Sequence, residues 1–88
     1  MVKVEIYSTV VCPYCTNAKK LLDKKGMQYE EIMVDRNPVE FENMLERSNG
    51  RRTVPQIFID DVHVGGFDDM SALDAEGKLD NMLGVQNG

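Results

Sequence analysis

The two cysteines of this 88-residue chain are separated by two residues, in the segment Cys12-Pro13-Tyr14-Cys15. An alternating segment, residues 2–8, precedes them, and residues 14–25 place apolar side chains at helical spacing. At a strand-to-helix junction the first sulfur meets unpaired N–H groups and the positive end of the helix dipole, which favour thiolate over thiol. The second sulfur, one turn further on, is close enough to close a small disulfide ring. The pattern therefore predicts a thiol–disulfide exchange site.

The rest of the chain predicts alternating strands and helices. We expect strands at residues 2–8, 28–34, 56–59 and 62–64, and helices at residues 14–25, 38–47, 67–76 and 79–83. The first helix connects two strands, so these strands should pair in parallel with a right-handed crossover. The order β-α-β-α-β-β-α, followed by the short helix 79–83, predicts one α/β domain, residues 1–88, with a mixed four-stranded sheet and helices on both faces. A polar tail, Gln86-Asn87-Gly88, should fray.

Several local signals support these boundaries. Gly26 is suited to the left-handed position that ends a helix. Asn37 can cap the second helix, with Glu40 three residues later as in a capping box, and an Asp can cap the helix that starts at Phe67. In the first strand, one face carries Val2, Val4 and Ile6, and the other carries Lys3, Glu5 and Tyr7. We expect His63 to be an exposed hairpin residue and the acidic face of helix 38–47 to be solvated.

Composition narrows the possible functions. A net charge of -5, with no basic run longer than two residues, argues against a nucleic-acid binder. No signal-peptide pattern and no apolar run near the roughly 20 residues that cross a bilayer is present, so we expect a cytoplasmic protein without membrane contact. In the reducing cytoplasm a cysteine pair is catalytic or metal-binding more often than structural. The alternatives are a short local disulfide or two incidental thiols. Structural zinc needs four ligands, and only His63 and carboxylates are left to supply two, so we expect no metal.

Three motifs in order carry a resemblance that covers essentially the whole chain. The segments Cys12-Pro13-Tyr14-Cys15, Thr53-Val54-Pro55 and Gly65-Gly66-Phe67-Asp68-Asp69 resemble those of the dithiol glutaredoxins in the thioredoxin superfamily, most closely the bacterial glutaredoxin 3 class. The resemblance implies a thioredoxin-like fold and a glutathione-dependent thiol–disulfide oxidoreductase. Its substrates would be disulfide-containing or glutathionylated proteins, with ribonucleotide reductase as a client by analogy only, and we expect a monomer.

The cysteines have distinct expected roles. Cys12 precedes the helix and is the better placed nucleophile, whereas Cys15 lies in the first turn, is more buried and resolves the mixed disulfide. The resemblance further implies that Pro55 is a cis proline facing the disulfide. It also implies that Val54 offers its backbone N–H and C=O to the cysteinyl part of glutathione, as in strand addition.

The remaining residues of the expected glutathione groove each have an alternative role. By resemblance Gly66, Phe67 and Asp68 hold the γ-glutamyl end, since backbone N–H groups at a helix start suit its α-carboxylate and Asp68 suits its ammonium group. Asp68 is alternatively only an N-cap. Tyr14 either lines the groove or fills space, and Thr53 either contacts glutathione or fixes the loop before Pro55.

Two positions depart from the family pattern. Many relatives have a lysine three residues before the first cysteine, which stabilises the thiolate and meets the glycine carboxylate of glutathione, whereas this chain has Thr9. Cationic help would then come from the helix terminus or from an arginine, with Arg36, Arg51 and Arg52 as candidates. Phe67 stands where relatives often have an additional cysteine.

Two other functions compete with the glutathione-dependent enzyme. A dimer could share an iron–sulfur cluster through Cys12 and glutathione, but family members that do so usually replace Pro13 with a smaller or more flexible residue. A thioredoxin-like reductant would be reduced by a flavoprotein. Tyr14 and the segment Gly65 to Asp68 argue against that class.

Overall fold

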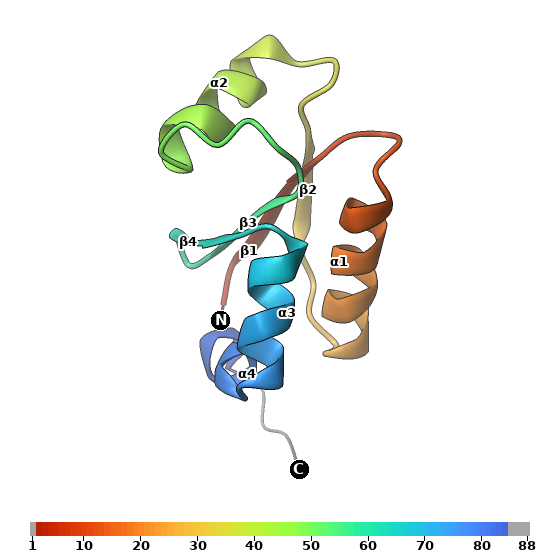
Figure 1. The fold of residues 1–88 in the computed structure, drawn as a ribbon, viewed down its shortest axis with the longest axis vertical. Coiled ribbons are helices and arrows are strands. Elements are labelled where there is room, and N and C mark those ends of the chain that lie inside the picture. Colours follow the sequence, from red (N-terminus) through yellow and green to blue (C-terminus); the bar gives the residue numbers. More distant parts are fainter. Residues whose placement is uncertain (1, 85–88) are drawn as a thin grey trace.

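The computed structural model describes residues 2–84, so the tail Gln86-Asn87-Gly88 lies outside the described residues. The elements follow the predicted order, including the last short helix (Figure 1). They are β1 (Val4–Ser8), α1 (Pro13–Lys24), β2 (Glu30–Met33), α2 (Pro38–Arg47), β3 (Gln56–Ile59), β4 (Val62–Gly65), α3 (Phe67–Ala75) and α4 (Lys78–Leu83). Within residues 2–84 no helix combines the length and the hydropathy that crossing a bilayer requires.

The sheet is mixed and four-stranded, with the order β2-β1-β3-β4. Strands β1 and β2 are parallel, and the pairs β1–β3 and β3–β4 are antiparallel. Asp60 and Asp61 form the turn between β3 and β4 with φ of 50° and 66°, a conformation that aspartate tolerates better than most residues. Because β1 and β2 are parallel, their carboxyl ends meet at one edge of the sheet, where α1 also starts.

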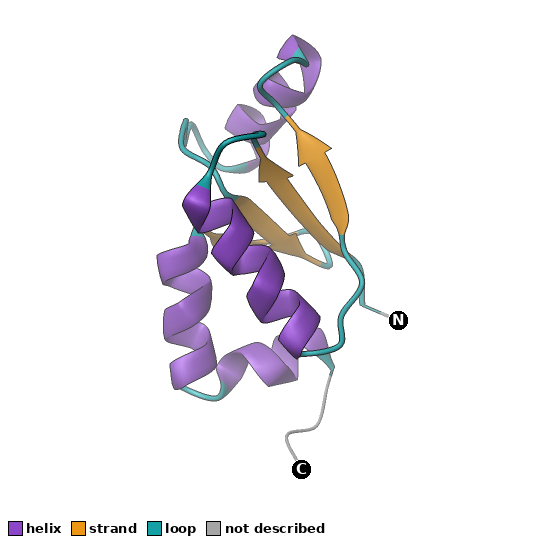
Figure 2. Ribbon diagram, turned by 90° about the vertical axis from the view of Figure 1, so that its right-hand side faces the viewer, coloured by secondary structure: helices purple, strands orange, loops and turns teal. Residues whose placement is uncertain are grey.

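Helices cover both faces of the sheet, as predicted, and α2 lies apart from the other three helices (Figures 1 and 2). The core of one face joins the sheet to α1, α3 and α4, and contains Val4, Ile6, Ala18, Leu22, Ile57, Ile59, Met70, Leu79 and Leu83. The core of the other face lies under α2 and contains Tyr7, Val34, Met44 and Phe58.

The face under α2 also buries a charge that the alternating pattern did not predict to be buried. Glu5 is only 7% exposed and forms an ion pair with Arg47, whose Nη2 lies 2.9 Å from Glu5 Oε1. The Arg47 guanidinium lies 4.0 Å from the Phe58 ring centroid and also bonds the Tyr7 hydroxyl. Hydrogen bonding to Arg47 lowers the pKa of Glu5, against a smaller opposing effect of burial. The ion pair with Arg47 allows the Glu5 carboxylate to stay charged in the largely apolar core under α2.

The helix ends follow the sequence signals with one difference. Gly26 has φ of 72° directly after α1 and its C-cap, as predicted. Asn37 Oδ1 accepts the Glu40 N–H at 3.3 Å, but the Glu40 carboxylate bonds the Asn43 amide at 2.7 Å instead of returning to the cap. The capping box is therefore only half formed, because a neighbouring side chain one turn on competes for the carboxylate.

The expectation that His63 is exposed is wrong. Its register partner is Phe58, and its ring stacks on the Phe58 ring with centroids 4.9 Å apart. Its Nε2 also lies 2.7 Å from Gln56 Oε1. Burial, with a contribution from Arg51, lowers the pKa of His63. A residue of a short hairpin is covered here because its strand pairs with a buried one.

Candidate active site

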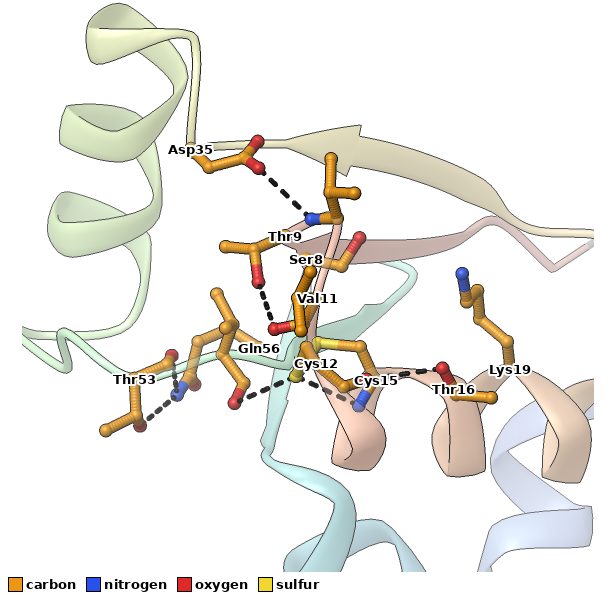
Figure 3. The surroundings of a disulfide bond; sticks show 12 residues. Ser8, Thr9, Val11, Cys12, Cys15, Thr16, Lys19, Asp35, Thr53 and Gln56 are labelled. Atoms are coloured by element: carbon orange, nitrogen blue, oxygen red, sulfur yellow. Dashed lines mark hydrogen bonds between the residues drawn. A yellow bond between two sulfur atoms is a disulfide. The ribbon is translucent and has the colours of Figure 1, made fainter.

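Both cysteines lie at the start of α1, where they are joined as a disulfide with Cα atoms 5.2 Å apart (Figure 3). Cys12 is the N-cap residue, in extended conformation, and Pro13 occupies the first helical position. The Cys15 N–H donates to Cys12 Sγ at 3.2 Å. Sulfur here takes the place of the oxygen of an ordinary cap, so a reduced Cys12 has an N–H donor and the helix dipole to stabilise negative charge.

The two sulfurs differ in access. Cys15 is 1% exposed, whereas Cys12 is partly exposed, in agreement with the expectation that Cys15 is the more buried of the two. An external sulfur therefore reaches Cys12 first. This order of access is what a nucleophile with an internal resolving partner requires.

The loop before β3 forms the wall opposite the cysteines. The Val54–Pro55 peptide bond is cis, as the resemblance implies, and Val54 O lies 3.9 Å from Cys12 Sγ. Gln56 holds this loop, because its Nε2 donates to Thr53 O at 2.9 Å and to Thr53 Oγ1 at 3.3 Å. Of the two roles expected for Thr53, these bonds support the one in which Thr53 fixes the loop before Pro55.

A cavity of about 140 Å³ lies beside this wall. The structure brings the seven residues predicted for the groove together around it. It adds Asp69 and also Arg51, which in the sequence is one of three candidate cations. Its lining consists of Tyr14, Arg51, Thr53, Val54, Pro55, Gly66, Phe67, Asp68 and Asp69. The pair of acids was visible in the sequence, but only the fold shows that Asp69 also lines the cavity.

The third side of the cavity is the start of α3. Gly66 is its N-cap residue, and Asp69 Oδ2 accepts the Gly66 N–H at 2.9 Å. The same oxygen lies 3.2 Å from Arg51 Nη1. The Gly66 N–H, then Arg51, lower the pKa of Asp69. The alternative in which Asp68 is the N-cap is thus wrong: Asp69, one turn into the helix, bonds the N-cap residue, and Asp68 stays exposed.

Gly65 is required by this arrangement. Its φ is +113°, which only glycine adopts readily, and a Cβ there would overlap the Asp69 carboxylate and lie 2.9 Å from Arg51 Nη1. The backbone of β4 thus comes close to the pair Arg51–Asp69, which leaves no room for a side chain.

The structure separates the three arginines proposed to replace the family lysine. Arg51 lines the cavity, whereas the Arg52 guanidinium lies 5.6 Å from the Phe41 ring centroid and Arg36 lies in a different hollow beside β2. Thr9 itself bonds its own loop, since its hydroxyl donates to Val11 O at 3.5 Å. Among the described residues, Arg51 is thus the one cation in the lining.

The residues 2–84 hold no group of three or more His, Cys, Asp or Glu side chains placed to bind a metal ion. A cysteine pair at a helix start, facing a proline loop on a mixed sheet, defines a thiol–disulfide oxidoreductase with a thioredoxin-like fold.

Comparison with known proteins assigns the chain to one family within this class. The sequence model of the family described as Glutaredoxin matches residues 4–64, and the chain belongs to that family. It is 54% identical over 83 residues to Glutaredoxin 3 of Escherichia coli K12, which covers 94% of this chain and 99% of that protein. It is therefore a glutathione-dependent thiol–disulfide oxidoreductase.

Two solved structures match the fold closely. The crystal structure of a buckwheat glutaredoxin–glutathione complex superposes with a TM-score of 0.85 at 34% identity, over 94% of this chain and 77% of that one. The solution structure of glutaredoxin from Brucella melitensis superposes with a TM-score of 0.82 at 54% identity, over 94% of this chain and 89% of that one.

Proposed function

We propose that the chain reduces protein disulfides and protein–glutathione mixed disulfides with Cys12 as the nucleophile and Cys15 as the resolving cysteine. The observation that carries these roles is the unequal access of the two sulfurs, with Cys15 1% exposed and Cys12 at the helix cap. Only Cys12 combines exposure with an N–H donor, so only Cys12 can attack an external disulfide as a stabilised thiolate.

The reduction of a protein disulfide proceeds by successive thiol–disulfide exchanges. The Cys12 thiolate attacks one sulfur of the substrate disulfide, forms a mixed disulfide with it, and releases the other sulfur as a thiolate. The Cys15 thiolate then attacks Cys12 Sγ, releases the fully reduced substrate, and closes the Cys12–Cys15 disulfide. The substrate gains two electrons and the enzyme loses them. Two glutathione thiols then reduce the enzyme by the same two exchanges and leave as glutathione disulfide.

A glutathionylated substrate needs only part of this sequence. When Cys12 attacks the glutathione sulfur, the protein thiolate leaves and glutathione stays on Cys12. A second glutathione then attacks that sulfur and regenerates the Cys12 thiolate, so Cys15 is not consumed.

We assign glutathione to the cavity beside the cysteines. Val54 offers its backbone to the cysteinyl part, with Tyr14, Thr53 and Pro55 around it, and the start of α3 at Gly66 and Phe67 offers N–H groups to the γ-glutamyl carboxylate. Because Arg51 and the Gly66 N–H already engage Asp69, the free carboxylate for the ammonium group is that of Asp68.

We further propose a monomer that works in the cytoplasm, where a reduced glutathione pool drives the cycle. Its clients would be disulfide-containing or glutathionylated proteins, and ribonucleotide reductase is one candidate by analogy with the family.

Single cysteine variants test the assigned roles. We expect Cys12→Ser to abolish turnover of every disulfide substrate, because no other exposed thiol remains. We expect Cys15→Ser to keep deglutathionylation, measured with glutathione and a glutathionylated peptide, and to lose reduction of protein disulfides. Each variant is the other's control for folding. Full activity of Cys12→Ser would overturn the assignment.

A further inference from the structure

Three hydrogen-bonded residues connect the β3–β4 hairpin to the loop at the cavity, and we call His63, Gln56 and Thr53 the relay. His63 Nε2, on β4, lies 2.7 Å from Gln56 Oε1 at the start of β3. The other end of the Gln56 amide donates to Thr53 O at 2.9 Å and to Thr53 Oγ1 at 3.3 Å (Figure 3). Gln56 is 0% exposed and has both ends of its amide bonded, so it joins His63 firmly to the loop before Pro55.

The chemistry of these atoms fixes the direction of each hydrogen bond in the relay. The Thr53 carbonyl can only accept, so the end of Gln56 that faces it is the NH2 group, and the Gln56 carbonyl faces His63. That carbonyl also only accepts, so His63 Nε2 carries a proton. Because burial, and then Arg51, lower the pKa of His63, the ring is neutral at pH 7 and holds its one N–H at Nε2. The relay therefore requires a single tautomer of His63.

The fold holds His63 in the place that this bond requires. The His63 ring stacks on Phe58, its register partner, with centroids 4.9 Å apart and planes 28° apart. Gln56 lies two residues before Phe58, on the same face of β3. Without the His63 donor, the buried Gln56 Oε1 would lose its partner among the described residues and would have no water in exchange. A buried acceptor without a donor is costly, so the Gln56 amide would turn and release Thr53.

We propose that His63 is a positioning residue for glutathione: through Gln56 it fixes Thr53, and with it the Val54 backbone offered to the cysteinyl part. The inference rests on the proposed function, since it assumes that glutathione binds along Val54. Within the described residues His63 does not line the cavity, so it acts on the loop and not by contact with the ligand. Val54 O lies 3.9 Å from Cys12 Sγ, so a displaced loop would misalign a glutathione sulfur with the nucleophile.

Two mixed disulfides of one peptide test this proposal. One carries glutathione, and the other carries cysteamine, which lacks the γ-glutamyl and glycyl groups. The measurement is the second-order rate constant with which the reduced protein releases the peptide thiol. We expect His63→Phe, which keeps an aromatic ring on Phe58, to lower this constant about fivefold for the glutathione form, as loss of one hydrogen bond predicts. The constant for the cysteamine form should stay unchanged, and His63→Gln, which restores an N–H donor, should recover most of the loss.

Two further variants separate positioning from a general loss of stability. Tyr7→Phe removes another part-buried hydrogen bond under α2, the one that Arg47 Nη1 donates at 2.9 Å, and should leave the ratio of the two rate constants unchanged. Gln56→Met removes the middle of the relay and should lower the constant for the glutathione form as His63→Phe does. Adding His63→Phe to Gln56→Met should lower it no further, because the two residues act in series.

The nitrogen chemical shifts of the His63 ring test the relay in a protein with the ring intact, so they do not depend on the folding of His63→Phe. At pH 7 they should show the Nε2–H tautomer. The Nε2 shift should also move when glutathione is attached to Cys12 in Cys15→Ser. The Nδ1–H tautomer, or an Nε2 shift that does not move, would contradict the proposal.

The remaining outcomes are distinguishable. An unchanged ratio of rate constants in His63→Phe would overturn the proposal and leave the proposed function standing. An equal fall for both mixed disulfides would mean that His63 acts on the reactivity of Cys12, which also overturns it. Equal rate constants for the two mixed disulfides in the intact protein would instead reject the assignment of glutathione to the cavity.

Discussion

Two helices begin at the same cavity and use their first turns differently. At α1 the cap is the Cys12 sulfur, which accepts the Cys15 N–H. At α3 the cap residue is Gly66, and the Asp69 carboxylate returns to accept its N–H. The same backbone feature thus supports a cysteine sulfur in one case and one side of the cavity in the other, according to which group satisfies the cap.

The first turns of α1 and α3 also differ in charge. The first turn of α1 contains no acidic residue, so the positive end of its dipole is left to the sulfur. The first turn of α3 contains Asp68 and Asp69, which offset that potential with negative charge. A site with both donors and acids suits a ligand with both an ammonium group and a carboxylate, such as the γ-glutamyl end of glutathione.

The largest expected effect comes from the close backbone approach at α3. Gly65→Ala introduces a positive-φ side chain that overlaps the pair Arg51–Asp69, and should lower the free energy of unfolding by about 2–3 kcal/mol in urea titrations. Gly26→Ala is the control, because its φ is +72° but nothing lies within 4 Å, so only about 1 kcal/mol of backbone strain applies. Equal losses would show that the pair is not rigid.

Removing the acid that caps α3 should have a smaller effect. Asp69→Ala should cost about 1 kcal/mol of unfolding free energy and raise KM for glutathione, since the Gly66 N–H and Arg51 lose their partner. The matched variant Asp69→Asn keeps an acceptor and removes only the charge.

The charge of Asp69 also predicts a pH dependence. Its native pKa lies below the ordinary 3.8, so its ionised form contributes stability above pH 3.8, and this contribution is lost as the pH falls through the lower native pKa. The difference in unfolding free energy between the intact protein and Asp69→Asn should therefore shrink below pH 3.8. A difference that is constant from pH 7 to pH 2 would contradict this.

An acidic residue added to the start of α1 should make its charge resemble that of α3. Thr16→Asp puts negative charge in the exposed first part of α1, and should slow alkylation of reduced Cys12 at neutral pH about two- to fivefold. Thr16→Asn removes the hydroxyl bond to Cys12 O without adding charge and serves as the control. If the two variants react equally fast, the helix dipole does not set the reactivity of Cys12.

The smallest effect on stability should come from Arg51. Arg51→Gln removes an ion pair whose two side chains are 45% and 48% exposed, so unfolding free energy should change by less than about 0.5 kcal/mol. KM for glutathione should still rise severalfold, because Arg51 is the cation of the described lining. An unchanged KM would remove Arg51 from the binding site.

Local sequence signals predicted most of the fold. Apolar periodicity and caps such as Gly26 and Asn37 place every helix and strand to within a few residues, because these signals depend on neighbours in the chain. The ionic layer under α2 could not be predicted in this way, since Glu5 and its partner Arg47 are 42 residues apart. His63 was misjudged for the same reason: its cover comes from Phe58 across the hairpin.

The candidate site likewise combines features that local sequence predicts with features that only the fold determines. The three motifs predicted seven lining residues, but the choice between Asp68 and Asp69 as partner of the α3 cap depends on side-chain direction. Likewise, three arginines were equal candidates in the sequence, and only the course of the chain after α2 brings Arg51 to the cavity. The hydrogen bond from the Val10 N–H to Asp35 Oδ2 likewise joins residues far apart in the chain, and no local pattern encodes it.

The burial of Cys15 has a practical consequence for chemical labelling. With that sulfur 1% exposed, a bulky maleimide added to the reduced protein should modify Cys12 and leave Cys15 unmodified. The protein can thus carry one fluorophore or spin label at a known position without deletion of a cysteine. Such a label would sit beside Val11 and the cavity, and would report the arrival of a partner directly.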